Sequence, residues 1–185
     1  MGVDLGKMVR RAVFLDRDGV INAAIVRDGK PYSASDVTET VLVDSAETSL
    51  ARLKEHGFLL IVVTNQPDVR RGTMSRERVD EIHRFLAAKL PLDDFFVCYH
   101  DDQDRCACRK PQPGLLLEAA KKYQIEVAQS YLIGDRWRDI GAGSAAGCRT
   151  IFVDHGYNER DPEPLPDIRV YALSEAVERI LEEVE

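Results

Sequence analysis

The sequence predicts a single α/β domain built on a doubly wound, Rossmann-like parallel sheet with helices on both faces. Short apolar runs alternate with longer stretches of helical periodicity, the order expected of repeated strand–helix units. The runs are continuously apolar and partly β-branched, as in parallel strands that are buried on both faces. A chain of 185 residues is long enough for one such domain with a full hydrophobic core.

The strand candidates are the apolar runs, which are each too short to be helices. They have few polar residues inside them, and polar or glycine-rich segments follow most of them. The predicted strands cover residues 11–15, 58–64, 95–99, 131–134 and 150–153, with a last candidate at 168–171.

The helix candidates lie between these runs and carry recognisable end signals. Ser75 can cap the second helix, and Pro113 suits the first turn of the third. Gly57 and Gly147 stand where helices should end. The predicted helices cover residues 45–56, 75–90, 113–124, 138–147 and 174–184.

Three segments fit neither pattern. Residues 22–44 form one long irregular stretch, which we interpret as a functional loop because long loops inside compact domains usually carry function. Residues 154–167 are rich in Pro and Asp and predict a surface connection. Residues 1–10 lack the apolar core of a signal peptide and predict a short leader, partly disordered, before a single domain at 11–185.

Composition and charge exclude several classes of function. Hydrophobic residues make up 44% and charged residues 31%, as in soluble globular proteins. The formal charge of −7 and the lack of interleaved aromatic and basic residues disfavour a nucleic-acid partner. No apolar run approaches the roughly 18 residues of a membrane span. We therefore expect a cytoplasmic monomer with no membrane partner.

The pair Asp16 and Asp18 is the most informative feature of the chain. It follows the apolar run Ala12-Val13-Phe14-Leu15 and precedes Gly19, so it stands at the tip of a predicted strand. Such a tip is a rigid support for reacting groups. Two carboxylates there supply one group that attacks or binds metal and one that moves a proton. Taken alone, the pattern is common in ordinary loops.

The other predicted strands end in residues that suit the same chemistry. Open parallel sheets bind ligands beyond the carboxyl ends of their strands, so the side chains that follow each strand should converge. Asp16 and Asp135 could hold Mg²⁺, while Lys110 neutralises phosphate oxygens and Thr64 donates a hydrogen bond. Each of these residues alone has an ordinary explanation as a cap, a turn or a solvated charge. Together they predict phosphoryl transfer on a small phosphorylated metabolite.

A cluster of cysteine and histidine residues precedes Lys110. Three thiols and one imidazole give the ligand count of a closed tetrahedral zinc site, at tighter spacing than most zinc patterns. The alternative is a set of reduced surface thiols beside an incidental histidine. We predict a structural zinc site that positions Lys110. Its ligands are Cys98, His100, Cys106 and Cys108.

On these residues the chain resembles the haloacid dehalogenase-type (HAD) phosphatases. The segments similar to their four motifs are Asp16-Arg17-Asp18-Gly19-Val20, Thr64-Asn65, Lys110, and Gly134-Asp135 with Asp139. The resemblance implies an HAD-like fold, with Asp16 as the nucleophile that forms an aspartyl-phosphate. It implies that Asp18 first protonates the leaving oxygen and then activates water.

The same resemblance implies a ligand set for Mg²⁺. The ion would be bound by the carboxylates of Asp16 and Asp135 and by the main-chain carbonyl of Asp18. Asp139 would hold a metal-bound water, orient Lys110 or act as a further metal ligand. Arg17, in the middle of the first motif, would be structural or would support a residue that touches substrate.

The zinc segment followed by Cys-Arg-Lys-Pro-x-Pro-Gly narrows the resemblance to HAD subfamily IIIA. It is similar to heptose bisphosphate phosphatases and histidinol-phosphate phosphatases, which lack a large cap domain, and this chain has no room for one between its motifs. The resemblance implies hydrolysis of D-glycero-D-manno-heptose 1,7-bisphosphate to the 1-phosphate, or else of histidinol phosphate or another small sugar phosphate. Arg109, Asn65 and Arg136 are its candidates for substrate contacts. The alternative that is not an enzyme is a non-catalytic sugar-phosphate-binding domain on the same fold.

The loop after the first motif departs from the heptose bisphosphate phosphatases. Those proteins usually carry an Asp-His-Gly-Tyr-like segment there, whereas this chain reads Ala-Ala-Ile-Val-Arg-Asp-Gly-Lys-Pro-Tyr at 23–32. The five-residue gap inside the zinc segment is nearer the histidinol-phosphate type. Arg27 and Lys30 either meet a second anionic group, which would favour a bisphosphate, or belong to a solvated turn.

Overall fold

A six-stranded parallel sheet forms the centre of the structure, a computed structural model that describes residues 9–184. The strand order is β5-β4-β1-β6-β7-β8, so the chain starts in the middle of the sheet and winds outward in both directions. This is the doubly wound fold that the sequence predicts, and the predicted fold class is confirmed. The strands are β1 Ala12–Leu15, β4 Leu59–Asn65, β5 Asp94–Cys98, β6 Tyr131–Gly134, β7 Arg149–Val153 and β8 Ile168–Val170.

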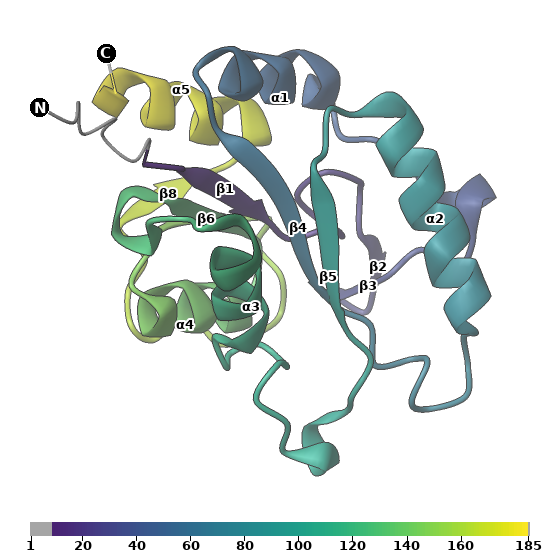
Figure 1. Ribbon diagram of the computed structural model, residues 1–185. Coiled ribbons are helices and arrows are strands. Elements are labelled where there is room, and N and C mark those ends of the chain that lie inside the picture. The colour runs from purple at the N-terminus through teal and green to yellow at the C-terminus, as the bar shows by residue number, and fades with distance from the viewer. Residues whose placement is uncertain (1–8, 185) are drawn as a thin grey trace, which may run out of the picture.

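Helices cover both faces of this sheet (Figure 1). Alternate residues of β1 point to opposite faces: Val13 and Leu15 pack in one cluster with α1, α2 and α5, whereas Ala12 and Phe14 pack in the other with α3 and α4. Each face therefore has its own apolar core, which holds β1 rigidly between them. The helices are α1 Ala46–Glu55, α2 Arg76–Lys89, α3 Gly114–Tyr123, α4 Trp137–Ala146 and α5 Leu173–Val184.

The predicted helix ends agree with the structure to within a few residues. The Ser75 hydroxyl accepts a hydrogen bond from the Arg78 N–H at 3.3 Å and caps α2. Gly57 and Gly147 follow α1 and α4 with positive φ angles of 81° and 88°. Pro113 stands one residue before α3, as its N-cap.

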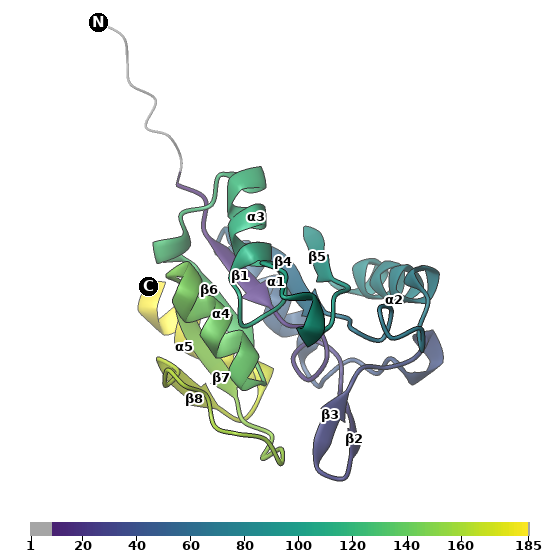
Figure 2. The same cartoon turned by 90° about the horizontal axis from the view of Figure 1, so that it is seen from below.

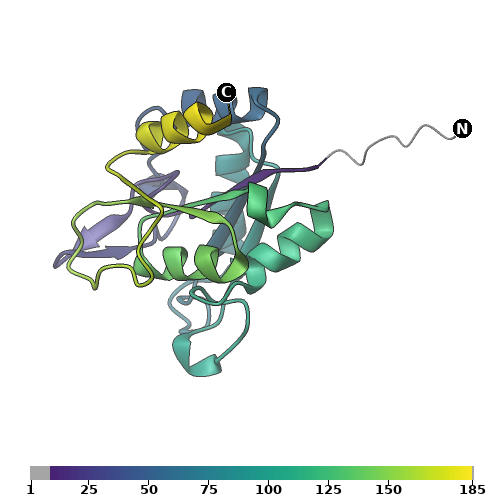
Figure 3. The same cartoon turned by 90° about the vertical axis from the view of Figure 1, so that its left-hand side faces the viewer.

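The segment 22–44 is not a plain loop. It contains an antiparallel hairpin, β2 Ile25–Arg27 and β3 Lys30–Tyr32, and a short 3₁₀ helix, η1 Val37–Glu39. Asp28 and Gly29 form the turn, with φ angles of 51° and 73°. Asp-Gly is a strong hairpin signal, but strands of three residues are too short to show alternation. Figure 3 shows the hairpin beyond the carboxyl end of β1.

The hairpin turn meets the connection between β7 and β8. The main-chain N–H of Asn158 donates to the carbonyl of Gly29 at 2.7 Å. Figure 2 shows these two segments side by side at the same edge of the sheet. The predicted surface connection therefore closes one side of the region beyond the strand ends.

Two further 3₁₀ turns occur within residues 9–184, η2 Asp102–Asp104 and η3 Val127–Gln129.

The predicted leader falls mostly on residues 1–8, which lie outside the described part of the chain. Arg10 belongs to the fold, since it forms a parallel bridge with Ile125. The domain boundary at residue 11 stays a prediction. Within residues 9–184, no helix has the length and apolar character needed to cross a membrane.

Candidate active site

The nucleophile candidate Asp16 follows β1, the strand at the centre of the sheet. Its main-chain N–H continues the ladder by donating to the Ile133 carbonyl of β6 at 2.9 Å. The register aligns Leu15 with Val62 on β4 and with Ile133 on β6, so these strands end near one another. The carboxylate of Asp16 is therefore held at a fixed position among the strand ends.

Three carboxylates and one ammonium group meet there. Oxygen atoms of Asp16, Asp135 and Asp139 all lie within 4.8 Å of one another. The Nζ atom of Lys110 lies 2.8 Å from Asp16 Oδ1 and 2.5 Å from Asp139 Oδ1, and it also donates to the Val63 carbonyl at 2.7 Å. All four side chains are buried, so these charges interact strongly.

The acids carry more negative charge than Lys110 compensates. Burial, and then the charges of Asp139 and Asp18, raise the pKa of Asp16 to about 6 although Lys110 opposes the shift. Burial and the charges of Asp16 and Asp139 raise the pKa of Asp135 well above its ordinary value. Apart from the nearby Tyr157 hydroxyl, which lowers the pKa of Asp135, no hydrogen-bond donor within residues 9–184 reaches either oxygen of the buried Asp135 carboxylate. Buried oxygens with so few donors among crowded acids fit a hard divalent cation such as Mg²⁺.

Gly19 allows the first motif to approach Asp135 closely. Its φ of +89° lies in the left-handed region that favours glycine. A Cβ atom built there would lie 1.8 Å from Asp135 Oδ2. Any side chain at position 19 would therefore occupy the place of the carboxylate.

Asp18 lies in a different environment from Asp16. Its carboxylate accepts hydrogen bonds from Asn22 Nδ2 at 3.0 Å and Gln66 Nε2 at 3.1 Å, and it pairs with Arg17 at 2.9 Å. Burial alone would raise the pKa of Asp18, but the Arg17 charge and the hydrogen bonds together lower it. The pKa values of the two carboxylates of the first motif are therefore shifted in opposite directions, and without metal or phosphate Asp16 holds a proton more readily than Asp18.

Thr64 and Asn65 end β4 at the same edge. The Thr64 hydroxyl accepts from Gln66 Nε2 at 2.9 Å and lines the pocket described below. Asn65 makes two bonds to the main chain of Lys110, donating to its carbonyl and accepting from its N–H, both at 3.1 Å. The amide of Asn65, a predicted substrate contact, here positions the lysine.

A polar pocket of about 270 Å³ opens over these groups. Lys30 and Tyr32 of the hairpin line it, whereas Arg27 does not; the Arg27 guanidinium lies over the Tyr32 ring, 5.7 Å from the centroid. Arg136 also lines the pocket and pairs with Glu159. The cations around the pocket are Lys30, Arg71, Arg109, Lys110, Arg136 and Arg138.

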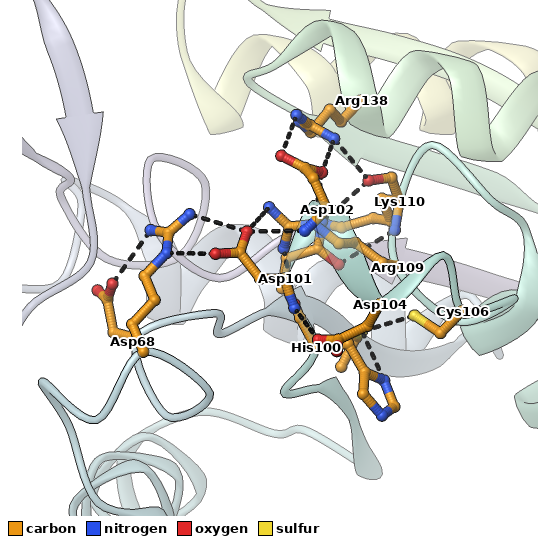
Figure 4. A network of polar contacts seen from close by, with 12 residues as sticks. Asp68, His100, Asp101, Asp102, Asp104, Cys106, Arg109, Lys110 and Arg138 are labelled. Carbon is orange, nitrogen blue, oxygen red and sulfur yellow. Dashed lines mark hydrogen bonds and ion pairs between the residues drawn. The ribbon is translucent and has the colours of Figure 1, made fainter.

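One carboxylate joins two of these cations at the pocket wall. Asp102 accepts from Arg109 Nε at 2.8 Å and from both terminal nitrogens of Arg138, at 2.9 and 3.1 Å (Figure 4). Arg138 is a pocket residue that the sequence reasoning missed. It stands three residues after Asp135, on the first turn of α4, and that spacing is the only signal that would have found it.

The four zinc-ligand candidates come together beside this wall. The sulfur of Cys98 lies 3.7 Å from that of Cys106 and 3.1 Å from that of Cys108. The Nδ1 atom of His100 lies 3.3 Å from Cys108 Sγ. One donor atom from each residue fits within 4.8 Å, and three thiols with one imidazole are a donor set that suits zinc.

The segment that carries these ligands is otherwise tied down by ion pairs. Arg71, from the loop after β4, donates to Asp101 at 2.7 and 3.0 Å and also pairs with Asp68 (Figure 4). Exposed pairs of this kind contribute roughly 0–1 kcal/mol each. Cys98 lies in the apolar core and Cys106 and Cys108 pack against it, whereas the turn between them depends on these weak pairs, and a metal would anchor that turn more firmly.

Comparisons with known proteins agree with this geometry. A family model described as HAD-hydrolase-like matches residues 107–178. A D-glycero-beta-D-manno-heptose-1,7-bisphosphate 7-phosphatase of Haemophilus ducreyi is 32% identical over 77% of this chain and 82% of its own length. A protein of the same name from Helicobacter pylori is 35% identical over 72% of this chain and 77% of its own.

The chain belongs to the HAD-like phosphatases. Membership of this family confirms the predicted activity as a phosphoric monoester hydrolase, without specifying the substrate. A solved member of the family, the D,D-heptose 1,7-bisphosphate phosphatase of B. bronchiseptica, has a TM-score of 0.77 and is 29% identical. The match covers 94% of this chain and 99% of that one, whose structure was solved with magnesium and phosphate. The magnesium in that structure supports a magnesium site in this HAD-like phosphatase, and the acid group of Asp16, Asp135 and Asp139 is compatible with one.

The HAD-like site has a further wall in the connection after β7. The ring Nε2 of His155 lies 2.7 Å from the Gly19 carbonyl, and a Cβ at Gly19 would lie 3.1 Å from the Tyr157 hydroxyl. Burial and the charge of Asp135 raise the pKa of Tyr157, so the phenol stays protonated. An Asp-His-Gly-Tyr sequence, 154–157, thus lies beside the first motif in space.

Proposed function

We propose that this HAD-like phosphatase removes the 7-phosphate of D-glycero-D-manno-heptose 1,7-bisphosphate, releasing the 1-phosphate and inorganic phosphate. The observation that carries the proposal is the buried group of Asp16, Asp135, Asp139 and Lys110 beneath a pocket lined by both cations and carboxylates. A second phosphate of the substrate would bind the cations beyond the reacting centre in exchange for the carboxylates that pair with most of them here. The names of the relatives support the choice of a heptose.

In the first half-reaction, a carboxylate oxygen of Asp16 attacks phosphorus and the bond from phosphorus to the sugar oxygen breaks. Asp18 gives its proton to that oxygen, and the product is an aspartyl-phosphate. An anionic phosphate beside Asp18 raises the pKa of this acid and favours the protonated form that the step needs. Bound Mg²⁺, held by Asp16, Asp135 and the Asp18 carbonyl, would screen the negative charges of nucleophile and phosphate.

In the second half-reaction, ionised Asp18 takes a proton from water, which attacks phosphorus and frees Asp16. Lys110 neutralises charge on the phosphate oxygens throughout, with Thr64 as a further donor. Both oxygens of Asp139 are already engaged, by Lys110 and by the Arg136 N–H at 3.0 Å. We therefore assign Asp139 to orienting Lys110 and not to direct contact with metal.

A phosphate-release screen in Mg²⁺ tests the proposed substrate. Heptose 1,7-bisphosphate is set against histidinol phosphate and monophosphorylated sugars, and we expect kcat/KM for the bisphosphate to exceed the others by at least about 10²-fold, the effect of two or more lost charged contacts. Higher kcat/KM for histidinol phosphate would establish the histidinol alternative. If none of these esters is hydrolysed, the proposed function is wrong and the result favours a non-catalytic sugar-phosphate-binding domain.

We also propose that Cys98, His100, Cys106 and Cys108 hold a structural zinc ion. Their segment runs directly into Arg109 and Lys110, so its order fixes the lysine that touches Asp16. Removing the ion should loosen this contact without removing the reacting metal.

Zinc removal should therefore lower turnover even when Mg²⁺ is in excess. After chelation and dialysis, we expect kcat to fall by about 10-fold or more, the size of effect produced by misplacing a catalytic group, and to recover with Zn²⁺ but not with Mg²⁺ alone. Cys106→Ala should behave like the stripped protein. Cys148→Ala, at a buried cysteine outside the cluster, is the matched control and should keep normal turnover. Full activity of a protein shown by metal analysis to be zinc-free would overturn the proposal.

A further inference from the structure

A buried histidine of α2 reaches the first motif from behind, and none of the roles above uses it. His83 is 8% exposed, and its ring stacks on Phe95 of β5 with 4.4 Å between centroids and 18° between planes. Its Nε2 atom lies 3.3 Å from the Nη1 atom of Arg17. The two residues are 66 positions apart in the chain.

Arg17 links this histidine to the proton-transfer residue. The Arg17 side chain is fully buried, and on the other side of its guanidinium it pairs with Asp18. Its Nε lies 3.1 Å from Asp18 Oδ2, and its Nη2 lies 2.9 Å from the same oxygen and 3.3 Å from Oδ1. The guanidinium therefore spans the space between Asp18 and His83, with donors directed to each.

The chemistry of this contact fixes the state of His83. A guanidinium only donates hydrogen bonds, so Nε2 must be the acceptor and the ring must be neutral, with its proton on Nδ1. Burial, and then the Arg17 charge, lower the pKa of His83 to about 3, in agreement with the neutral form. The Phe95 stack holds the ring plane.

A neutral acceptor is what this position requires. A cation would repel Arg17, and a carboxylate would compete with Asp18 for the same guanidinium. An apolar residue would leave a buried N–H of Arg17 without a partner, which is unfavourable and favours rotation of the group. Imidazole fixes the guanidinium without cancelling its charge.

We infer that His83 is a positioning residue that acts through Arg17 to hold the Asp18 carboxylate toward the leaving oxygen of the substrate. The inference rests on the proposed function, since it takes Asp18 as the group that protonates that oxygen. Asp18 lines the pocket while His83 does not, so His83 does not contact substrate there, and its hydrogen bond to Arg17 is the contact that connects it to Asp18.

The test uses the leaving group, because only a poor leaving group needs the proton. Alkyl phosphates, including heptose bisphosphate, release an alkoxide that must be protonated, whereas p-nitrophenyl phosphate releases a stable phenolate. His83→Phe keeps the ring and removes the acceptor, and His83→Gln keeps an acceptor oxygen. Ile82→Val is the control for a disturbed helix core, because Ile82 is buried on the same helix.

The comparison uses kcat/KM, which reports formation of the phosphoenzyme and not its later hydrolysis, a step that the two substrates share. We expect His83→Phe to lower kcat/KM for the alkyl phosphate about 10-fold or more, within the range of general acid catalysis, and for p-nitrophenyl phosphate less than about twofold. His83→Gln should recover most of the alkyl activity, and Ile82→Val should affect both substrates alike. Equal losses on both substrates, no loss on either, or a His83→Gln variant as impaired as His83→Phe would overturn the inference. If His83→Phe does not fold, His83→Leu replaces it as the variant without an acceptor.

Asp18→Asn separates this inference from the proposed function. It should show the same dependence on leaving group, with a larger loss on the alkyl phosphate. If Asp18→Asn lowers kcat/KM for both substrates equally, Asp18 is not the proton donor in phosphoenzyme formation and the proposed mechanism fails. If Asp18→Asn shows the dependence and the His83 variants do not, the mechanism stands and only the inference fails.

Discussion

Asp16→Asn should abolish turnover and leave the fold intact. The amide cannot attack phosphorus, and removal of a covalent nucleophile costs about 10⁴-fold or more in kcat. The folded protein should not become less stable, because burial already raises the pKa of Asp16 to about 6 and its charge opposes folding. Turnover is measured by phosphate release and stability by thermal unfolding without metal, at pH 7.5, where this carboxyl is ionised in the wild type.

The covalent step itself can be observed. Acid quenching during turnover of ³²P-labelled substrate should trap a hydroxylamine-sensitive phosphoenzyme in the wild type and none in Asp16→Asn. Asp68→Asn serves as the matched control, since Asp68 also lines the pocket but lies outside the buried acid group. It should form the phosphoenzyme normally. Label retained by Asp16→Asn would refute the assignment of the nucleophile.

Lys110→Met should damage both stability and activity. The ammonium group is the cation that pairs with Asp16 and Asp139 in the buried cluster, and the acids raise the pKa of Lys110 above its usual value despite its burial. Breaking a buried pair by removing one partner costs about 3–5 kcal/mol in free energy of unfolding. Loss of a donor to the transferring phosphate should lower kcat by about 10²–10³-fold. Denaturant unfolding and steady-state kinetics measure the two effects.

A double-mutant cycle with Asp139→Asn tests the role assigned to Asp139. If Asp139 orients Lys110, the two substitutions should be coupled, so that the double variant loses less stability than the sum of the single losses, by about 1–3 kcal/mol. The kcat losses should also be less than multiplicative. Independent effects, together with a raised Mg²⁺ requirement in Asp139→Asn, would instead make Asp139 a metal ligand.

The sequence predicted the sheet and the convergence of the site because both follow from simple regularities. Parallel strands bring their carboxyl ends to one edge, so Asp16, Lys110 and Asp135 meet although they lie far apart in the chain. Apolar runs and glycine stops located the elements with little ambiguity. The hairpin at 25–32 was missed because strands of three residues give no periodic signal, although Asp28-Gly29 marked its turn.

The sequence could not predict individual polar contacts. Asn65 bonds to the Lys110 backbone, and His83 reaches Arg17, through packing of elements whose mutual placement no local pattern encodes. The same holds for the shared partner of Arg109 and Arg138, a surface aspartate among several in one segment. Residue type and spacing identify reacting groups, whereas the groups that position them depend on tertiary packing.

The close approach of Gly19 to Asp135 has a consequence for interpreting related sequences. Because any Cβ at position 19 would fall on the carboxylate, the two positions cannot vary independently: a larger residue at 19 is tolerated only where the aspartate has moved or been lost. A homologue that keeps both aspartates of its first motif but has lost this glycine is therefore expected to hold its counterpart of Asp135 in a different position.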